Sequence, residues 1–469
     1  MRAGLRIAAI AGLVWLSAVG PGVTQERAAP RSRPEVQLSF APVVKKAAPA
    51  VVNIVNRRRQ VATPFRSPLL DDPFFRRFFG DQLEDQSQPA SVGSGVIVQP
   101  DGLIVSNNHV IANAEEIIVV LADRREFPAK VVIADERTDL AVLRIDPGNE
   151  RLPVIELMNS DELEVGDLVL AIGNPFGVGQ TVTSGIVSAL ARTRLGITDY
   201  QFFIQTDASI NPGNSGGALV TMDGRLAGVN TAIFTQSGGS VGIGFAIPAN
   251  MVASVINAAL HGGRIARPWL GAAAQPVTAE IASSLGLARP AGALLRTVVP
   301  GSPADRAGLK VGDVVVALDG RPVDDPEALN YYVALKPIGQ RATLGVRRGG
   351  RVTEVAVDLA SPPEVPPRNV TDIGGQNPLT GARVANLSPA LADELGLDPV
   401  ASAQGVIILG IARGSPAQRV RLRPGDIILQ VNRSGIDTVE DLQRALGAAS
   451  EWRIRFRRGG QELNLVARG

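Results

Sequence analysis

An internal repeat in the last 200 or so residues constrains the fold more than any other feature of the sequence. Several short motifs recur at an offset of 110 to 113 residues. Gly-Ser-Pro-Ala occurs at 301–304 and 414–417, Gly-Asp at 312–313 and 425–426, Leu-Gly-Leu at 285–287 and 395–397, and Arg-Arg-Gly-Gly at 347–350 and 457–460. Matches in one order with small insertions are the signature of two copies of one domain.

The repeat divides the chain into segments. Residues 264–361 form the first copy and 369–469 the second. Between them, 362–368 read Pro-Pro-Glu-Val-Pro-Pro-Arg, which favours a stiff, extended linker. Ahead of the repeat, 35–262 is predicted to be one larger domain, and 1–25 a leader. A chain of 469 residues has room for about three domains.

The larger domain reads as a series of short strands. Apolar runs at 95–98 and 103–106 flank Pro-Asp-Gly, and runs at 218–221 and 226–230 flank Met-Asp-Gly-Arg, which predicts two β-hairpins. Further strands are expected at 117–121, 130–133 and 141–145. Many short strands at this spacing predict a sandwich or barrels. A helix over 249–260 closes the domain, stopped by the glycines that follow His261.

Composition excludes several classes of site. The chain has no cysteine, so disulfides, thiolate zinc sites and a cysteine nucleophile are excluded. It has two histidines, so we expect no histidine-rich metal site and no cofactor, although an all-carboxylate metal site stays open. A net charge of +2 without a clustered basic face gives no case for nucleic acid.

The N-terminus resembles a secretory signal. Arg2 and Arg6 precede a short apolar run at 7–19, and small residues follow. The run is too short for a convincing membrane span, but no clean cleavage motif follows it, so a retained anchor at the inner-membrane surface is the alternative. In both cases we expect the rest of the protein to lie outside the cytoplasm.

Three residues of the larger domain could form a serine nucleophile site. Ser215 stands in Gly213-Asn214-Ser215-Gly216-Gly217, where glycines permit successive N–H groups to turn toward one point. The expected oxyanion hole consists of Gly213, Asn214 and Ser215, with the N–H groups of Gly213 and Ser215 as donors. On its own the motif is equally a glycine-rich turn.

A serine nucleophile needs a base and an acid that orients the base. His109 is the histidine of the β-rich domain, whereas His261 stands beside the helix stop. Asp139 precedes the apolar run Leu-Ala-Val-Leu and can stay buried against an imidazole. Asp135, Glu136 and Asp146 compete for this role, and spacing alone does not reject them.

Together, Asn108-His109-Val110, Thr138-Asp139-Leu140-Ala141 and Gly213–Gly217 resemble the HtrA (Deg/Do) family of serine proteases, and the repeat resembles two PDZ domains. The resemblance implies a mainly β chain: a chymotrypsin-like double β-barrel followed by two PDZ domains. It implies His109 as general base, Asp139 as its orienting acid and Ser215 as nucleophile. The order of these residues also disfavours an α/β-hydrolase esterase, in which the serine comes first.

The resemblance extends to regulation. Phe74, Phe75, Phe78 and Phe79 stand in a segment similar to a long loop of the family that contacts other subunits and can block a resting active site. Their spacing would place them on one face of a helical turn; a buried cluster is the alternative. Arg192 resembles the arginine that relays activation, with a plain surface arginine as the alternative.

Substrate contacts are expected at two places. Thr231, Ala232, Ile233 and Phe234 would line the primary pocket, with Ile210 opposite. No acidic residue stands there, so we expect cleavage after small or medium aliphatic residues. In the first repeat Trp269-Leu270-Gly271 lies where PDZ domains bind a peptide carboxylate. The second repeat has Leu379-Thr380-Gly381, which departs from the family pattern, so it either binds peptides or serves assembly.

The resemblance therefore implies a periplasmic, ATP-independent endoprotease that degrades unfolded proteins, with chaperone capacity. No phosphate-binding loop of the Walker type is present. The resemblance implies as partners unfolded proteins, peptides with free C-termini and copies of the chain itself, in an oligomer built from trimers. The alternative is a non-proteolytic PDZ scaffold or holdase on a protease fold.

Overall fold

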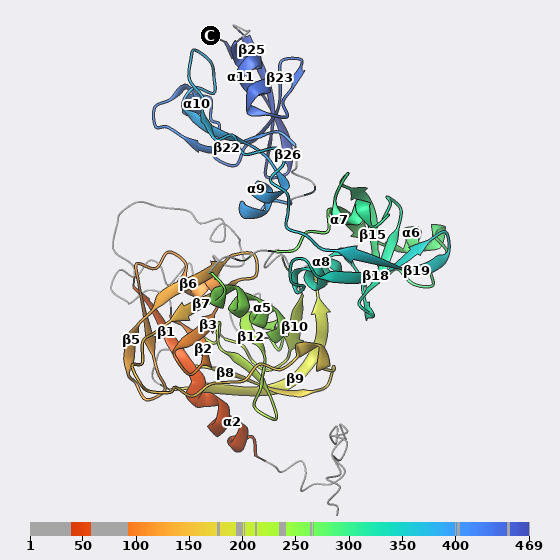
Figure 1. Cartoon of the computed structure of the whole chain (residues 1–469). Coiled ribbons are helices and arrows are strands. Elements are labelled where there is room, and N and C mark those ends of the chain that lie inside the picture. The colour runs from red at the N-terminus through yellow and green to blue at the C-terminus, as the bar shows by residue number, and fades with distance from the viewer. Residues whose placement is uncertain are drawn as a thin grey trace, which may run out of the picture. The chain divides into compact units, whose positions relative to one another are not determined.

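The computed structural model describes residues 39–57, 92–175, 179–193, 200, 202–211, 213–233, 241–262, 265, 267–398, 400, 404–447 and 451–468. Three successive parts of the chain each build their own β-structure, as the colour bands of Figure 1 show. The predicted leader at 1–25 and the four phenylalanines between 74 and 79 lie outside the described residues. Within the described ranges, no helix is long and apolar enough to cross a membrane.

The first part begins with α2 (Ala41–Ala47) and the 3-10 turn η1 (Ala48–Ala50) and continues into a seven-stranded antiparallel sheet of order β5-β4-β1-β2-β3-β7-β6. Its strands are β1 (Val51–Arg57), β2 (Val92–Gln99), β3 (Leu103–Ser106), β4 (Glu116–Val120), β5 (Glu126–Pro128), β6 (Lys130–Asp135) and β7 (Leu140–Arg144). The first predicted hairpin is confirmed, because β2 pairs with β3 across the Asp-Gly turn. A short helix, α4 (Asn108–Ile111), follows β3.

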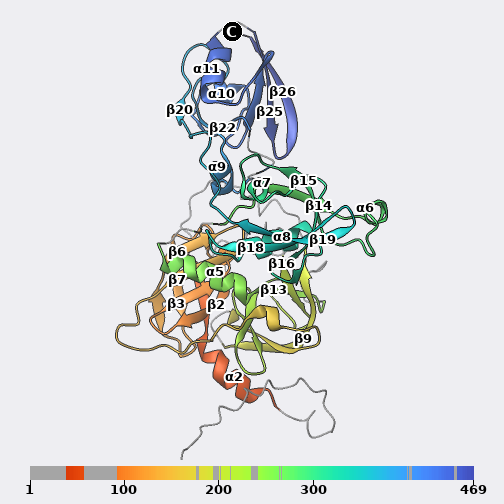
Figure 2. The same cartoon turned by 45° about the vertical axis from the view of Figure 1, so that its right-hand side comes forward.

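The same first part of the chain continues into a closed barrel of order β10-β13-β12-β11-β8-β9. After the 3-10 turn η3 (Ser160–Glu162), its strands are β8 (Leu168–Gly173), β9 (Thr181–Arg192), β10 (Phe203–Thr206), β11 (Ala218–Thr221), β12 (Leu226–Ile233) and β13 (Gly244–Pro248). The second predicted hairpin is confirmed by the pairing of β11 with β12. The predicted helix is α5 (Ala249–Leu260); it buries Met251, Val252 and Val255 and lies against β7, as Figure 2 shows.

The two repeats fold alike. In the first, β14 (Ala272–Pro276), β15 (Ala293–Val298), β16 (Val314–Leu318), β18 (Arg341–Arg348) and β19 (Arg351–Asp358) form a sheet in that order, with β17 (Arg321–Pro322) beside β16. In the second, β21 (Ala382–Asn386), β22 (Val406–Ile411), β23 (Ile427–Val431), β25 (Glu451–Arg458) and β26 (Gln461–Arg468) repeat the order, with β24 (Ser434–Gly435) beside β23. A further strand, β20 (Thr371–Asp372), pairs with β21.

The helices of the repeats also correspond. The first copy has α6 (Ala279–Ser284), α7 (Pro303–Arg306) and α8 (Pro326–Ala334), and the second has α9 (Pro389–Glu394), α10 (Pro416–Arg419) and α11 (Val439–Gly447). The Gly-Ser-Pro-Ala motif begins a helix in each copy. The hydroxyls of Ser302 and Ser415 accept hydrogen bonds from the N–H groups of Asp305 and Gln418, and a proline occupies the first turn.

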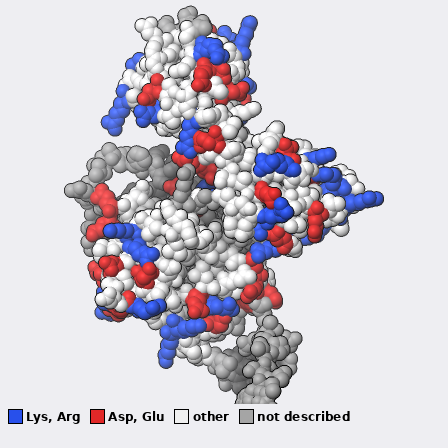
Figure 3. Space-filling view, in the orientation of Figure 1, with Lys and Arg blue, Asp and Glu red and all other residues white. Residues whose placement is uncertain are grey.

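Charged side chains of both signs are interspersed on the face shown in Figure 3. One ion pair recurs in the two repeats. The buried Asp313 carboxylate accepts two hydrogen bonds from the Arg348 guanidinium, of 2.6 and 2.7 Å, and Asp426 and Arg458 repeat the pair at the same two distances. The sheets of the first part and the matching sheets of the two repeats confirm the predicted mainly β fold and its internal duplication.

Candidate active site

The predicted nucleophile lies in a tight loop between β10 and β11. Gly213 and Gly216 have φ angles of 95° and 82°, in the region that favours glycine. Space excludes side chains as well: a Cβ on Gly216 would lie 2.1 Å from the carbonyl oxygen of Ser94, and one on Gly213 2.4 Å from Cβ of Pro175. The glycines on both sides of Ser215 are therefore required by backbone conformation and by close packing.

The backbone N–H groups of the nucleophile loop fall into two sets, one with carbonyl acceptors in the described part of the chain and one without. The N–H groups of Asn214, Gly216 and Gly217 donate to carbonyl oxygens of Asn211, Asn230 and Asn214, at 3.0, 2.8 and 2.9 Å. Among the described residues, the N–H groups of Gly213 and Ser215 have no such acceptor. The role of these two N–H groups as oxyanion donors stays a prediction.

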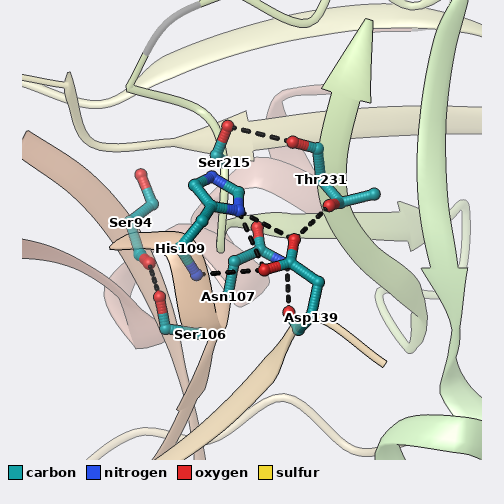
Figure 4. Close-up of polar contacts among 7 residues, drawn as sticks. All are labelled: Ser94, Ser106, Asn107, His109, Asp139, Ser215 and Thr231. Carbon is teal, nitrogen blue, oxygen red and sulfur yellow. Dashed lines mark hydrogen bonds and ion pairs between the residues drawn. The ribbon is translucent and has the colours of Figure 1, made fainter. Parts of the chain in front are cut away.

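His109 and Asp139 come from different elements and meet at the site. His109 is on α4, directly after β3, and Asp139 precedes β7, which pairs with β3. The imidazole Nδ1 is 2.7 Å from Oδ2 and 3.0 Å from Oδ1 of Asp139, and the His109 N–H donates to Oδ1 at 3.0 Å. Figure 4 shows the imidazole ring between the carboxylate and Ser215. Both side chains are about nine-tenths buried.

The turn that presents Asp139 has an unusual backbone. Asp139 has a φ of 56°, which costs a non-glycine residue about 1 kcal/mol. The conformation is held by its carbonyl oxygen, which accepts hydrogen bonds from Asn107 Nδ2 at 2.9 Å and from the Asn108 N–H at 3.1 Å. Of the competing acids, Asp135 accepts from the Thr138 hydroxyl and Asp146 from the Gly148 N–H. The carboxylate that contacts His109 is that of Asp139.

Thr231 links the serine and the aspartate. Its hydroxyl donates to Asp139 Oδ2 at 2.7 Å, and its carbonyl oxygen accepts from the Ser215 hydroxyl at 3.2 Å (Figure 4). Proton transfer to His109 would require the Ser215 hydroxyl to turn toward the imidazole, and such contacts often tighten only when substrate binds. The sequence placed Thr231 in the substrate pocket; its contact with the acid was not predicted.

Ser94 is a second contact that sequence reasoning missed. It is fully buried on β2, its N–H donates to the Ser215 carbonyl at 2.8 Å, and its hydroxyl donates to the Gly213 carbonyl at 2.6 Å. The same hydroxyl accepts from the Asn174 N–H at 2.8 Å, and the Ser94 carbonyl accepts from Ser106 at 2.7 Å. The signal that could have found it is Gly93-Ser94-Gly95, a second serine between glycines.

The remaining predicted residues are placed as follows. Ile210 is buried in the core of the barrel, and Ala232 and Ile233 belong to β12. Phe234 lies outside the described residues, and Arg192 ends β9. Trp269 and Leu270 are buried ahead of β14. Their roles in binding and regulation stay predictions. In the part of the chain that the structure describes, no group of three or more histidine, aspartate or glutamate side chains is placed to hold a metal.

Family models match the chain in both regions. The model described as a trypsin-like peptidase domain matches residues 93–229, and the model described as a PDZ domain matches 268–359 and 393–467. A probable periplasmic serine endoprotease, DegP-like, from Chlamydia pneumoniae is 42% identical over 88% of this chain and 85% of its own length. The periplasmic serine endoprotease DegP of Escherichia coli K12 is 38% identical over 91% of both chains.

A solved structure and a further relative agree. The HtrA-type protease AlgW in complex with a decapeptide is 45% identical and has a TM-score of 0.51, over 70% of this chain and 99% of that one. The E. coli pH-dependent endoprotease DegQ is 38% identical over 92% of this chain and 91% of its own. With a trypsin-like domain, two PDZ domains and relatives at this identity over nine-tenths of its length, the chain belongs to the HtrA family of serine endoproteases, in its DegP/DegQ-like group.

Proposed function

We propose that this endoprotease uses Ser215 as nucleophile, His109 as general base and Asp139 as the acid that orients it. The Ser215 hydroxyl attacks a peptide carbonyl while His109 Nε2 takes its proton, and the same proton later passes to the leaving amine. The contact of 2.7 Å between His109 Nδ1 and Asp139 carries the proposal, because it fixes the imidazole with Nε2 directed away from the acid. Asp139 would stabilise the imidazolium as it forms.

The developing oxyanion would be held by the N–H groups of Gly213 and Ser215. Support comes from the hydrogen bonds that occupy the neighbouring N–H groups and leave these two available among the described residues. Donors already oriented toward the position of the charge stabilise a tetrahedral intermediate without further rearrangement. A water molecule then repeats the attack on the acyl-enzyme and releases the second product.

We infer that the substrates are unfolded proteins in the periplasm and that the chain acts as a homo-oligomer built from trimers, with chaperone capacity. The names of the DegP and DegQ relatives support the compartment. The decapeptide complex of the AlgW protease supports peptide ligands. We assign peptide binding to the first PDZ domain, and N-terminal export to the segment 1–25.

Casein degradation by the wild type and by Ser215→Ala tests the catalytic assignment. The substitution removes the nucleophile, so we expect the rate to fall by at least about 1,000-fold. Circular dichroism and size-exclusion elution should match the wild type, since Ser215 contributes one hydrogen bond through its side chain. Equal rates for the two proteins would favour the alternative, a non-proteolytic scaffold or holdase.

Cleavage-site profiling tests the substrate pocket. The proposed lining, Ile210 and the residues 231–234, contains no acidic side chain, so it offers no partner for a basic P1 residue. We expect the new C-termini in a digested unfolded protein to be mainly Val, Ala and other small or medium aliphatic residues. Dominant cleavage after Lys or Arg would contradict this assignment.

A further inference from the structure

We propose that the peptide groove of the second PDZ domain is filled by the chain's own segment 367–373, so that the first PDZ domain takes external peptides. A PDZ domain binds a peptide as an extra antiparallel strand on the free edge of one strand, with the peptide C-terminus held in a nest of backbone N–H groups. In the second repeat that strand is β21, which follows the predicted carboxylate loop at 379–381.

The backbone of the segment occupies the edge of β21. One edge of β21 pairs with β22, and the other pairs with β20 in antiparallel register, with Thr371 opposite Val384. The contact continues beyond β20 at both ends. The N–H of Ile373 donates to the Ala382 carbonyl at 2.8 Å, and the N–H of Asn386 donates to the Arg368 carbonyl at 2.7 Å. The chain thus follows β21 over its whole length.

The end of the segment takes the position of a peptide carboxylate. The Gly381 N–H, in the carboxylate loop, donates to the carbonyl oxygen of Ile373 at 2.9 Å. A ligand that runs antiparallel to β21 has its C-terminal residue at this end of the strand. Ile373 therefore stands where the last residue of a bound peptide would stand, and its carbonyl oxygen accepts a hydrogen bond from the loop.

The Ile373 side chain fills the apolar end of the groove. It is 5% exposed and belongs to the same core cluster as Leu379 of the loop and Leu442 and Leu446 of α11. Helix α11 is the wall opposite β21, because it contacts that strand. An apolar side chain between the loop and this helix is the arrangement expected for an anchored C-terminal residue.

Polar contacts fix the other end of the segment. Asn369 Nδ2 donates to Glu440 Oε1 on α11 at 2.6 Å, and Asn386 Nδ2, on β21, donates to the Pro367 carbonyl at 2.8 Å. The segment therefore contacts both walls of the groove. Along it, Asp372 pairs with Arg383 of β21 through two hydrogen bonds, of 2.9 and 3.0 Å.

Among its described residues, the first PDZ domain has the same groove with no segment paired to its edge. Within the described residues, β14 pairs with β15 alone, and the N–H of Gly271, the counterpart of Gly381, has no acceptor. The wall residues correspond at the offset of 113: Leu329 and Val333 of α8 match Leu442 and Leu446. At the offset of 110, the strand residues Thr371 and Asp372 correspond to His261 and Gly262, which form a turn after the end of α5 at Leu260.

Covalent attachment makes the internal ligand hard to displace. A short linker gives an attached ligand an effective concentration of the order of millimolar. A free peptide at micromolar concentration would therefore compete at a disadvantage of roughly 1,000-fold. The proposal that the second PDZ domain fills its own groove depends only on contacts within the second repeat. The proposal that the first PDZ domain takes external peptides depends on the peptide binding proposed for it under the function of the protein.

Hydrogen–deuterium exchange on the full Ser215→Ala chain tests the proposal without a peptide and with one. Without peptide, we expect the amides of Ile373 and Gly381 to be protected at least about 100-fold over an unstructured chain. A saturating decapeptide that ends in Val should add protection at β14 and none at β21. Exchange of Ile373 at the unstructured rate, or peptide protection at β21 with loss of protection at 371–373, would overturn the self-filled groove.

A matched pair of variants tests the anchor. Ile373→Asn removes the buried side chain, whereas Val370→Asn changes a side chain that is 54% exposed in the same segment. Isothermal titration with the decapeptide should give one site per chain for the wild type and Val370→Asn, and a second site for Ile373→Asn. If Ile373→Asn unfolds the domain, the hydrogen–deuterium exchange of the chain with Ile373 intact still tests whether the segment fills the groove. Loss of binding to β14 alone would refute the peptide site of the first PDZ domain and leave the self-filled groove intact.

Discussion

Ser94 holds two carbonyl groups of the nucleophile loop at once, those of Gly213 and Ser215. The Gly213 carbonyl belongs to the peptide plane between residues 213 and 214, and the Ser215 carbonyl to the plane between residues 215 and 216. Holding these two planes limits rotation of the planes next to them, which carry the N–H groups of Gly213 and Ser215. Ser94 is therefore a positioning residue for the proposed oxyanion hole.

Replacing Ser94 by Ala should lower kcat by about 10- to 100-fold and leave KM within about twofold, because the missing hydrogen bonds affect the transition state more than substrate binding. Ser106→Ala is the control, since among the described residues it removes a neighbouring hydroxyl whose one hydrogen bond goes to the Ser94 carbonyl. Steady-state cleavage of a short peptide measures both constants. A folded Ser94→Ala enzyme with wild-type kcat would contradict the assignment.

The three reacting side chains could be predicted from sequence, but their supporting residues could not. His109 is one of two histidines in the sequence, and the other, His261, stands at the end of the helix that closes the domain; Ser215 lies between glycines. Ser94 and Thr231 contact the site from strands that are 119 and 92 residues from their partners in sequence. Such contacts depend on which strands become neighbours, and local spacing does not encode that choice.

At the scale of elements, one ion pair recurs in both PDZ domains. Asp313 stands at the start of β16 and Arg348 at the end of β18; Asp426 and Arg458 occupy the same places in the second copy. Burial alone would raise the pKa of Asp313. The hydrogen bonds from Arg348 and from the Lys310 N–H outweigh that effect and hold the pKa below its ordinary value.

A lowered pKa in the folded state means that Asp313 stabilises the domain above its unfolded pKa of about 4, and that this stability is lost as pH falls through the folded value. Asp313→Asn should therefore destabilise the first PDZ domain by roughly 1–3 kcal/mol at pH 7. The difference from the wild type should shrink below pH 4. Amide exchange in β18, corrected for intrinsic rates, measures the difference at each pH.

Asp358→Asn is the control for this prediction. Asp358 pairs with Arg341 in the same sheet, but both side chains are exposed by about two-thirds, and exposed pairs contribute little. We expect its effect to be much smaller at every pH. An Asp313→Asn effect that is constant between pH 7 and pH 3 would show that the lost stability does not come from the ionised carboxylate.

Elements with a local signal were predictable, and their partners in the sheets were not. The two hairpins follow from Asp-Gly turns between apolar runs, and α5 from an apolar run that ends at a glycine pair. The position of β1 between β2 and β4, and the addition of β20 to β21, have no counterpart in local spacing. The proline-rich segment 362–368 reads as a linker, yet the residues that follow it form a strand of the second PDZ domain.

At the scale of the whole molecule, the duplication could be predicted because the same motifs recur in the same order along two segments of about a hundred residues each. The repeated sequence predicted two domains of one fold, and the structure has two sheets of matching strand order. The copies differ ahead of the carboxylate loop: β20 pairs with β21 in the second, whereas among the described residues β14 of the first pairs with β15 alone. We infer from this difference that both copies kept the peptide groove after the duplication. The segment ahead of the carboxylate loop determines whether the groove is filled from within the chain.

Labelling with diisopropyl fluorophosphate tests the central claim most directly, since this reagent phosphorylates an activated serine hydroxyl. After incubation of the full chain at neutral pH, peptide mass mapping should place one adduct on Ser215, with casein degradation lost in proportion. His109→Ala should take up no label, because the serine then lacks its base. An adduct on a different serine that accompanies loss of activity, or full activity after Ser215 is modified, would contradict the account.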